Sequence, residues 1–182
     1  MSNLKDHISK RIQKFISKQK IFFVATATDK SRINLSPKGM DSFRVMDEKK
    51  VLWLNLTGSG NETAAHLDVD GRITIMFCSF EGAPMILRLY GKGKVINPND
   101  KKWSSAVDQF PKQAGTRQII EIDIEAVQTS CGMSIPMYNF KEERLELDEW
   151  AQGKGEEGIK EYWKEKNEVS IDGIPTQIQK GY

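Results

Sequence analysis

The stretch RITIMFCSFEGAPMILRLYGKGKVI, residues 72–96, sets the fold class that the sequence predicts. Its two runs of β-branched and other apolar side chains, Arg72–Cys78 and Met85–Ile96, are typical of strands. Between them, Glu81-Gly82-Ala83-Pro84 carries the glycine and the proline that mark a turn. Two strands joined by so short a connection run antiparallel, because a parallel pair needs a crossover of about a dozen residues or more.

Runs of the same kind on both sides of this hairpin predict four more strands, at Ile21–Thr26, Arg32–Leu35, Val51–Leu56 and Thr116–Val127. Helical patterns are confined to Glu62–Leu67, Lys101–Phe110 and Glu156–Lys166. Strands in close succession with few helices favour an antiparallel sheet closed into a barrel over a β-α-β fold. We therefore expect a mainly β protein with peripheral helices, forming a single domain over residues 1–182.

The two ends of the chain differ in character from the strand-rich middle. Residues 1–20 place Leu4, Ile8, Ile12, Phe15 and Ile16 at helical spacing, which predicts a helix packed on the domain. A basic helix on a membrane surface is the less favoured alternative, because the apolar stripe is narrow and has no Trp anchor. Residues 139–182 are expected to form a charged helix and tail. Within them, residues 141–168 hold ten acidic and six basic side chains, and we expect this stretch to cover one end of the barrel.

Composition and charge exclude several classes of protein. The net charge of +2 gives no reason to expect a nucleic-acid partner. The two cysteines, Cys78 and Cys131, form no CxxC pair, which excludes a disulfide framework and a thiolate zinc site. With only two histidines, the sequence also excludes a multi-histidine metal site. The longest apolar run, Ile21–Ala27, is too short to span a bilayer, and no small-residue cleavage site follows the N-terminus. We expect a cytoplasmic protein with no metal and no membrane partner.

The most informative motif is Thr57-Gly58-Ser59-Gly60-Asn61-Glu62-Thr63, which follows a predicted strand and opens a predicted helix. Its glycines allow close approach of a ligand, and Ser59 and Glu62 have the spacing of a capping box. The helix start would point amide N–H groups outward, so the segment is a candidate site for an anion such as a phosphate. It matches neither a Walker A loop nor GxGxxG. A well-capped helix after a glycine-rich loop is the equally weighted alternative.

Two further segments favour the binding interpretation. Asn34-Leu35-Ser36-Pro37-Lys38-Gly39 ends a predicted strand and displays a hydroxyl and an ammonium group that suit a phosphate or a polarised carbonyl. Arg88 lies between Leu87 and Leu89 on a predicted strand and faces away from them. An arginine in an apolar strand needs a carboxylate or a bound anion as its partner, and a structural salt bridge is nearly as well supported as a ligand.

In this order, the motifs Ser36–Gly39, Thr57–Thr63 and Leu87–Gly91 resemble those of the FMN-binding split-barrel proteins related to pyridoxamine 5'-phosphate oxidase. The resemblance runs from about Phe22 to Tyr138. It implies a six-stranded antiparallel split β-barrel that forms a homodimer with FMN at the subunit interface. The cofactor-binding residues that it implies are Asn34, Ser36, Lys38, Thr57, Gly58, Ser59, Gly60, Asn61, Glu62, Thr63, Arg88, Ser130, Cys131 and Gly132. The last three would come either from the same chain or from the second subunit.

The chain departs from the family pattern at two places. Where the family oxidases offer an Arg-Lys pair at the helix start to neutralise the phosphate, the matching residues are Glu62 and Thr63. Neutralisation would then fall to Lys38, Arg88 and backbone amides. The family's Arg-Leu-His-Asp-Arg-like run, which contacts the substrate, is also missing: Trp150 is followed by Ala-Gln-Gly-Lys-Gly. We therefore expect a small-molecule substrate other than a pyridoxine 5'-phosphate vitamer.

Three other features carry open alternatives. Cys131 suits a buried or flavin-contacting thiol better than a nucleophile, because no histidine lies near it in sequence. Nothing in the sequence supports a Ser–His–Asp triad on His66. The aromatic and polar residues from Tyr162 to Pro175 suit a helix packed by its aromatic side chains and then a turn, and a lid over the flavin pocket is the weaker alternative.

The resemblance implies an FMN-dependent oxidoreductase in which the flavin carries the redox chemistry. Lys38 or Arg88 would stabilise the reduced flavin anion, and no catalytic residue is assigned. The first alternative is a flavin- or haem-binding carrier or sensor without turnover, in which haem is disfavoured because only His7 and His66 offer an imidazole. The second is a deazaflavin (F420)-dependent reductase, which would need a more basic groove.

Overall fold

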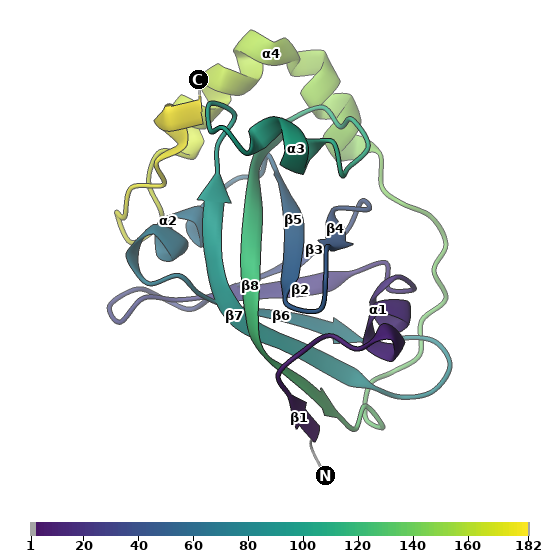
Figure 1. Cartoon of the computed structure of the whole chain (residues 1–182). Helices are drawn as coiled ribbons and strands as arrows, with labels where there is room; N and C mark the ends of the chain where they lie inside the picture. The colour runs from purple at the N-terminus through teal and green to yellow at the C-terminus, as the bar shows by residue number, and fades with distance from the viewer. Residues whose placement is uncertain (1–2, 182) are drawn as a thin grey trace.

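The computed structural model describes residues 3–181, and its centre is one antiparallel sheet of eight strands in that range. Seven strands follow the order β3-β2-β6-β7-β8-β5-β4, and β1 pairs with β8 off this path. The strands are β1 (Asn3–Lys5), β2 (Phe22–Thr26), β3 (Asn34–Lys38), β4 (Phe43–Val45), β5 (Lys50–Leu56), β6 (Arg72–Cys78), β7 (Ile86–Ile96) and β8 (Thr116–Ser130). The sheet curls, so that β2 and β6 cross the direction of β5 (Figure 1).

Four α-helices and one 3₁₀ turn surround the sheet in the described residues. They are α1 (Lys10–Ile16), α2 (Glu62–Val69), α3 (Trp103–Val107), α4 (Glu146–Lys166) and η1 (Ile178–Gly181). Helices α3 and α4 lie at one end of the sheet, and the coil that joins β8 to α4 runs back along the length of the molecule to reach it (Figure 1). No helix in residues 3–181 combines the length and the apolar character that a membrane crossing requires.

The main core lies inside the curl of the sheet. Its largest fully buried side chains include Trp53, Phe77 and Leu89, and Phe22 and Phe77 stack with their ring centroids 5.7 Å apart. Helix α1 closes this core with Ile12 and Ile16. A second cluster joins Leu54 and Phe110 beneath α3, and a third forms around Trp163 of α4.

A β-bulge bends the longest hairpin of the sheet. The register between β7 and β8 shifts between Tyr90 and Gly91. A Cβ atom on Gly91 would lie 2.2 Å from the carbonyl oxygen of Asp123, so the two backbones approach as closely as they do only because position 91 is glycine.

The structure corrects several predicted boundaries. The helix expected over residues 1–20 is shorter, because Asn3–Lys5 instead pairs with β8; Ile8, Ile12 and Ile16 are buried as expected, whereas Leu4 is exposed, and residues 1–2 lie outside the described range. The strand expected at Arg32–Leu35 is displaced to Asn34–Lys38, and Pro37 fits there because β3 pairs only with β2 and is an edge strand. Helix α4 begins ten residues before its predicted start at Glu156, and Gly155 interrupts it with a φ of 66°.

Candidate functional site

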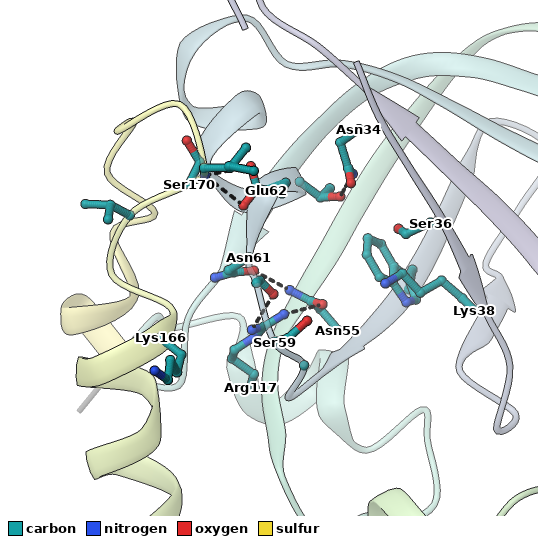
Figure 2. A pocket seen from close by; sticks show the side chains of 16 residues that line it. Asn34, Ser36, Lys38, Asn55, Ser59, Asn61, Glu62, Arg117, Lys166 and Ser170 are labelled. Carbon is teal, nitrogen blue, oxygen red and sulfur yellow. Dashed lines mark hydrogen bonds between the residues drawn. The ribbon is translucent and has the colours of Figure 1, made fainter. Parts of the chain in front are cut away.

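A cavity of about 570 Å³ opens between β3, the loop before α2 and the segment that follows α4 (Figure 2). Three stretches far apart in sequence meet there, and Arg117 of β8 completes the wall. The lining residues are Asn34, Ser36, Lys38, Trp53, Asn55, Gly58, Ser59, Gly60, Asn61, Glu62, Thr63, Arg117, Lys166, Val169, Ser170 and Ile171.

Strand β3 contributes every second residue to this pocket. Side chains alternate between the two faces of a strand, so Asn34, Ser36 and Lys38 face the cavity together. Leu35, on the other face, is 62% exposed. The Asn34 amide donates to Thr63 Oγ1 over 3.1 Å, which joins β3 to the first turn of α2.

Lys38 is the cation of the β3 side. Its Nζ lies 5.1 Å from the centroid of the Trp53 ring, which is almost fully buried. No carboxylate in residues 3–181 forms an ion pair with it. Burial, and to a smaller extent the positive charge of Arg117, lower the pKa of Lys38 from 10.5 to about 8. The pocket therefore holds an ammonium group that a bound anion would stabilise.

A network of buried side-chain amides supports the loop before α2. Asn55 Nδ2 donates to Asn61 Oδ1 over 3.0 Å, and Asn61 Nδ2 donates to Gln118 Oε1 over 3.0 Å. Helix α2 starts at Glu62, with Asn61 rather than Ser59 at the N-cap position. The predicted capping box is therefore wrong: the Glu62 carboxylate accepts from the backbone N–H of Ile171, at 3.2 Å to each oxygen.

Arg117 is a buried cation in the pocket wall. It is 3% exposed, and its guanidinium donates to Gly60 O, Asn167 Oδ1 and Asn55 Oδ1 over 3.1, 2.7 and 3.0 Å. Its Nε has no hydrogen-bond partner. Burial lowers the pKa of Arg117 from 12.5 to about 9, so the side chain still carries its charge at neutral pH.

The segment after α4 forms the remaining wall. Val169, Ser170 and Ile171 line the cavity. The Trp163 indole donates to Thr57 Oγ1 over 2.8 Å, and Arg32 pairs with Asp172 beyond the pocket rim. The favoured interpretation of residues 162–175, a packed helix and a turn, describes Trp163 correctly, but the same segment also reaches the pocket.

Nine of the predicted cofactor residues meet in this cavity, and five do not. Thr57 lies behind the wall, where its hydroxyl donates to Gly115 O over 2.7 Å. Arg88 donates to Ser130 Oγ over 3.2 Å, outside the residues that line the cavity. Cys131 is exposed, and Gly132 is buried against the backbone of Met85. Within one chain, the expectation that Arg88 and residues 130–132 share the pocket with Lys38 is therefore not met.

Neither histidine lines the pocket. His66 is 1% exposed, and its Nδ1 lies 3.1 Å from Thr26 Oγ1. His7 contacts Asp6 at the surface. The described part of the chain contains no cluster of three or more His, Cys, Asp or Glu side chains that could hold a metal ion.

Sequence reasoning missed Trp53, Asn55, Arg117, Lys166, Val169 and Ile171 as pocket residues, and it placed Ser170 at the pocket only in the weaker alternative of a lid. Arg117 had one usable feature: an arginine followed by a glutamine at the start of a half-buried strand must find polar partners when it is buried. No local pattern places residues 166–171 there, because their position depends on how α4 lies on the sheet.

The family model for pyridoxamine 5'-phosphate oxidase matches residues 8–131. The chain belongs to the pyridoxamine 5'-phosphate oxidase family. A curated relative, the pyridoxamine 5'-phosphate oxidase family protein ustO of Aspergillus flavus, is 35% identical over 190 residues, which cover 93% of this chain and 76% of that protein. Residues 132–182, including the segment that forms one pocket wall, lie outside the part that the family model matches.

Two solved structures share the fold. A single-site variant of HupZ from Group A Streptococcus superposes with a TM-score of 0.58 at 21% identity, covering 68% of this chain and 99% of that one. HutZ, the heme storage protein of Vibrio cholerae, gives a TM-score of 0.51 at 17% identity, covering 69% and 97%. The predicted class, a mainly β antiparallel split barrel, is confirmed, with eight strands rather than six in the described residues.

Proposed function

We propose that this protein binds FMN in the 570 Å³ cavity and transfers electrons between the flavin and a small organic molecule. The observation that carries the proposal is the convergence of Asn34, Ser36 and Lys38 with residues 58–63 on one cavity. These are the residues that the family resemblance implied for cofactor binding, and they come from segments about 20 residues apart in the sequence.

The residues of the cavity fit a flavin mononucleotide. The volume of the cavity falls within the range of about 300–1,000 Å³ that is usual for cofactor pockets. The Trp53 ring gives the wall an aromatic surface, as a flat heteroaromatic ring system requires. The orphaned Nε of Arg117 and the unpaired ammonium of Lys38 offer positive charge to an anionic group.

FMN supplies the redox chemistry when bound, and the protein contributes orientation and electrostatics. Lys38 holds a positive charge in a partly buried position, where electrostatic interactions are stronger than in water. That charge favours the anionic form of a reduced ligand over its neutral oxidised form. Lys38, rather than Arg88, takes this role because Lys38 lines the cavity and Arg88 does not.

A non-catalytic carrier or sensor is the second candidate, and one observation favours it. Among the described residues that line the cavity, Glu62 is the single carboxylate, and its oxygens accept from the backbone N–H of Ile171. The cavity therefore offers no histidine and no free carboxylate to move a proton. A haem carrier fits less well, because His66 is buried away from the cavity and His7 lies at the surface. A deazaflavin reductase stays a third hypothesis.

We further propose a homodimer, in which a second copy completes the site. Arg88, Ser130 and Cys131 lie together outside the cavity of their own chain. The coil that follows them exposes Met133, Met137, Tyr138, Phe140 and Leu145. Apolar side chains so exposed along an extended segment are typical of an interface between chains.

The test of the proposed function is reconstitution followed by turnover. Purified protein is titrated with FMN, and quenching of flavin fluorescence gives the affinity. The loaded protein is then reduced without oxygen and mixed with candidate acceptors. Reoxidation faster than that of free reduced FMN supports an oxidoreductase; binding without faster reoxidation supports the carrier; no binding of FMN contradicts both.

A further inference from the structure

Arg117 lacks the kind of partner that a buried arginine normally has. Its hydrogen bonds go to a backbone carbonyl and to the amide oxygens of Asn55 and Asn167, which are all neutral groups. No carboxylate in residues 3–181 lies within ion-pair distance of it. Buried charges in proteins are nearly always paired, so the missing negative charge points to a ligand.

The position of Arg117 gives such a ligand access to it. The side chain lines the cavity beside Ser59 and Asn61 (Figure 2), and its Nε–H, though fully buried, donates to no protein atom. The bonds to Gly60, Asn167 and Asn55 use three of the five N–H donors of the guanidinium. The Nε–H and one N–H of Nη2 are thus left for a group in the cavity.

Asn167 fixes this arrangement from the segment after α4. It is fully buried; its Oδ1 accepts from Arg117 over 2.7 Å, and its Nδ2 donates to Gly58 O over 3.0 Å. One side chain therefore ties together the start of β8, the glycine-rich loop and the C-terminal segment. This segment lies beyond the residues that the family model matches.

Arg117 is the most deeply buried of the cations that line the cavity. Lys166 lines the cavity, but half of its side chain is exposed and its Nζ pairs with Glu165 over 2.7 Å. Lys38 and Lys166 lie on opposite sides of the view in Figure 2, with Arg117 between them. Glu62 and Thr63 occupy the start of α2, where the family oxidases carry cations.

We propose that Arg117 is the cation of a phosphate-binding subsite in this cavity, with Asn167 as the residue that positions it. The inference rests on the proposed function in one respect: the phosphate is taken to be that of FMN. In this proposal, Arg117 of β8 supplies the positive charge that the start of α2 does not supply, and Asn167 after α4 holds Arg117 in place. Without a ligand, burial depresses the pKa of Arg117, and a bound dianion would reverse this effect.

The experiment compares FMN with riboflavin, which lacks the phosphate, on the full chain and three variants. Arg117→Met removes the charge and keeps most of the side-chain volume. Asn167→Asp keeps a hydrogen-bond acceptor at Arg117 but pairs the guanidinium with a carboxylate. Arg11→Met is the matched control, because Arg11 is exposed on α1 and does not line the cavity.

We expect Arg117→Met and Asn167→Asp each to weaken FMN at least tenfold and riboflavin less than threefold, which matches the loss of one charge-assisted contact. The control should change neither affinity. A merely structural role for Asn167 would weaken both flavins together, and an unchanged preference for FMN in both variants would overturn the subsite. If Arg117→Met does not fold, Asn167→Asp decides.

Inorganic phosphate provides an arm that does not depend on the flavin. Millimolar phosphate at constant ionic strength should raise the thermal midpoint of the wild type and of Arg11→Met, and should not raise it in the other two variants. If the wild type binds neither flavin but shows this protection, the proposed function fails and the subsite stands. If phosphate protects all four proteins equally, or none of them, and the flavin preference is also unchanged, the subsite is wrong.

Discussion

Replacing Lys38 with methionine separates the electrostatic role of this residue from its packing. The ammonium lies 5.1 Å from the Trp53 ring in the cavity, and burial lowers its pKa to about 8. A flavin carbonyl at Lys38 and the phosphate elsewhere in the same cavity both favour the protonated amine, so FMN binds more tightly below this pKa and more weakly above it. At neutral pH, loss of the charge should cost about 1.5–3 kcal/mol of binding free energy, or roughly 10- to 100-fold in affinity.

The pH profile gives the effect its signature. Protonated Lys38 falls from about nine-tenths of the molecules at pH 7 to about one-tenth at pH 9, so the Kd for FMN should rise roughly tenfold over this range. Arg117, with a pKa of about 9, adds about a factor of two. In Lys38→Met only the twofold change should remain. The assay is fluorescence titration of FMN at pH 7, 8 and 9, with Lys30→Met, at an exposed lysine, as the control.

The folding stability of the protein should rise with pH, whereas its affinity for FMN should fall. Because the folded pKa of Lys38 lies below its unfolded value of about 10.5, the unfolded chain binds more protons between about pH 8 and 10.5, and stability rises with pH across this window. Below pH 8, holding the charged amine in the folded pocket costs up to about 3 kcal/mol. Lys38→Met should therefore be more stable than the wild type at pH 7 while binding FMN more weakly. A wild-type Kd for FMN that is flat from pH 7 to 9, or a Lys38→Met variant whose Kd has the same pH slope, would exclude this electrostatic role for Lys38.

Three further predictions concern the fold, the substrate and the assembly. Gly91→Ala should lower the free energy of unfolding, measured in urea titrations, by about 1–3 kcal/mol or more, because the new Cβ would meet the backbone of Asp123. Gly153 has open space around it, so Gly153→Ala should be neutral or stabilising. Equal stability of the two variants would contradict the bulge geometry. The FMN-loaded protein should form little or no pyridoxal 5'-phosphate from pyridoxamine or pyridoxine 5'-phosphate, because the family's substrate-contacting run is absent after Trp150; turnover on the order of 1 per second or faster would overturn this. Sedimentation at low micromolar concentration should show a dimer, and a monomer that still binds FMN would exclude an interface site.

The strands could be predicted from the sequence because their signal is local. Alternating and continuous apolar runs identified β2, β5, β6, β7 and β8 to within a few residues. The short strands β1 and β4 were not predicted, because three residues are too few to show an alternation of apolar and polar side chains. Their pairing also depends on neighbours distant in sequence. The predicted strand Arg32–Leu35 ended before Pro37, because the place of this proline on an edge strand is a property of the whole sheet.

The site could be predicted in part for the same reason. Ser36, Lys38 and the Gly58–Thr63 loop carry turn and glycine signals that point to a ligand before any fold is known. Arg117 and Asn167 lie 50 residues apart and become partners only when α4 has packed on the sheet. Arg88 was predicted as a binding residue because it is a cation in an apolar strand, but its hydrogen bond to Ser130 lies outside the cavity that holds Lys38.

The absorption spectrum of the protein as purified shows whether the cavity holds a flavin. We expect a yellow protein with the two visible bands of an oxidised flavin, which releases FMN on denaturation, identified by its mass. A Soret band, or a colourless protein that ignores added FMN, would contradict it.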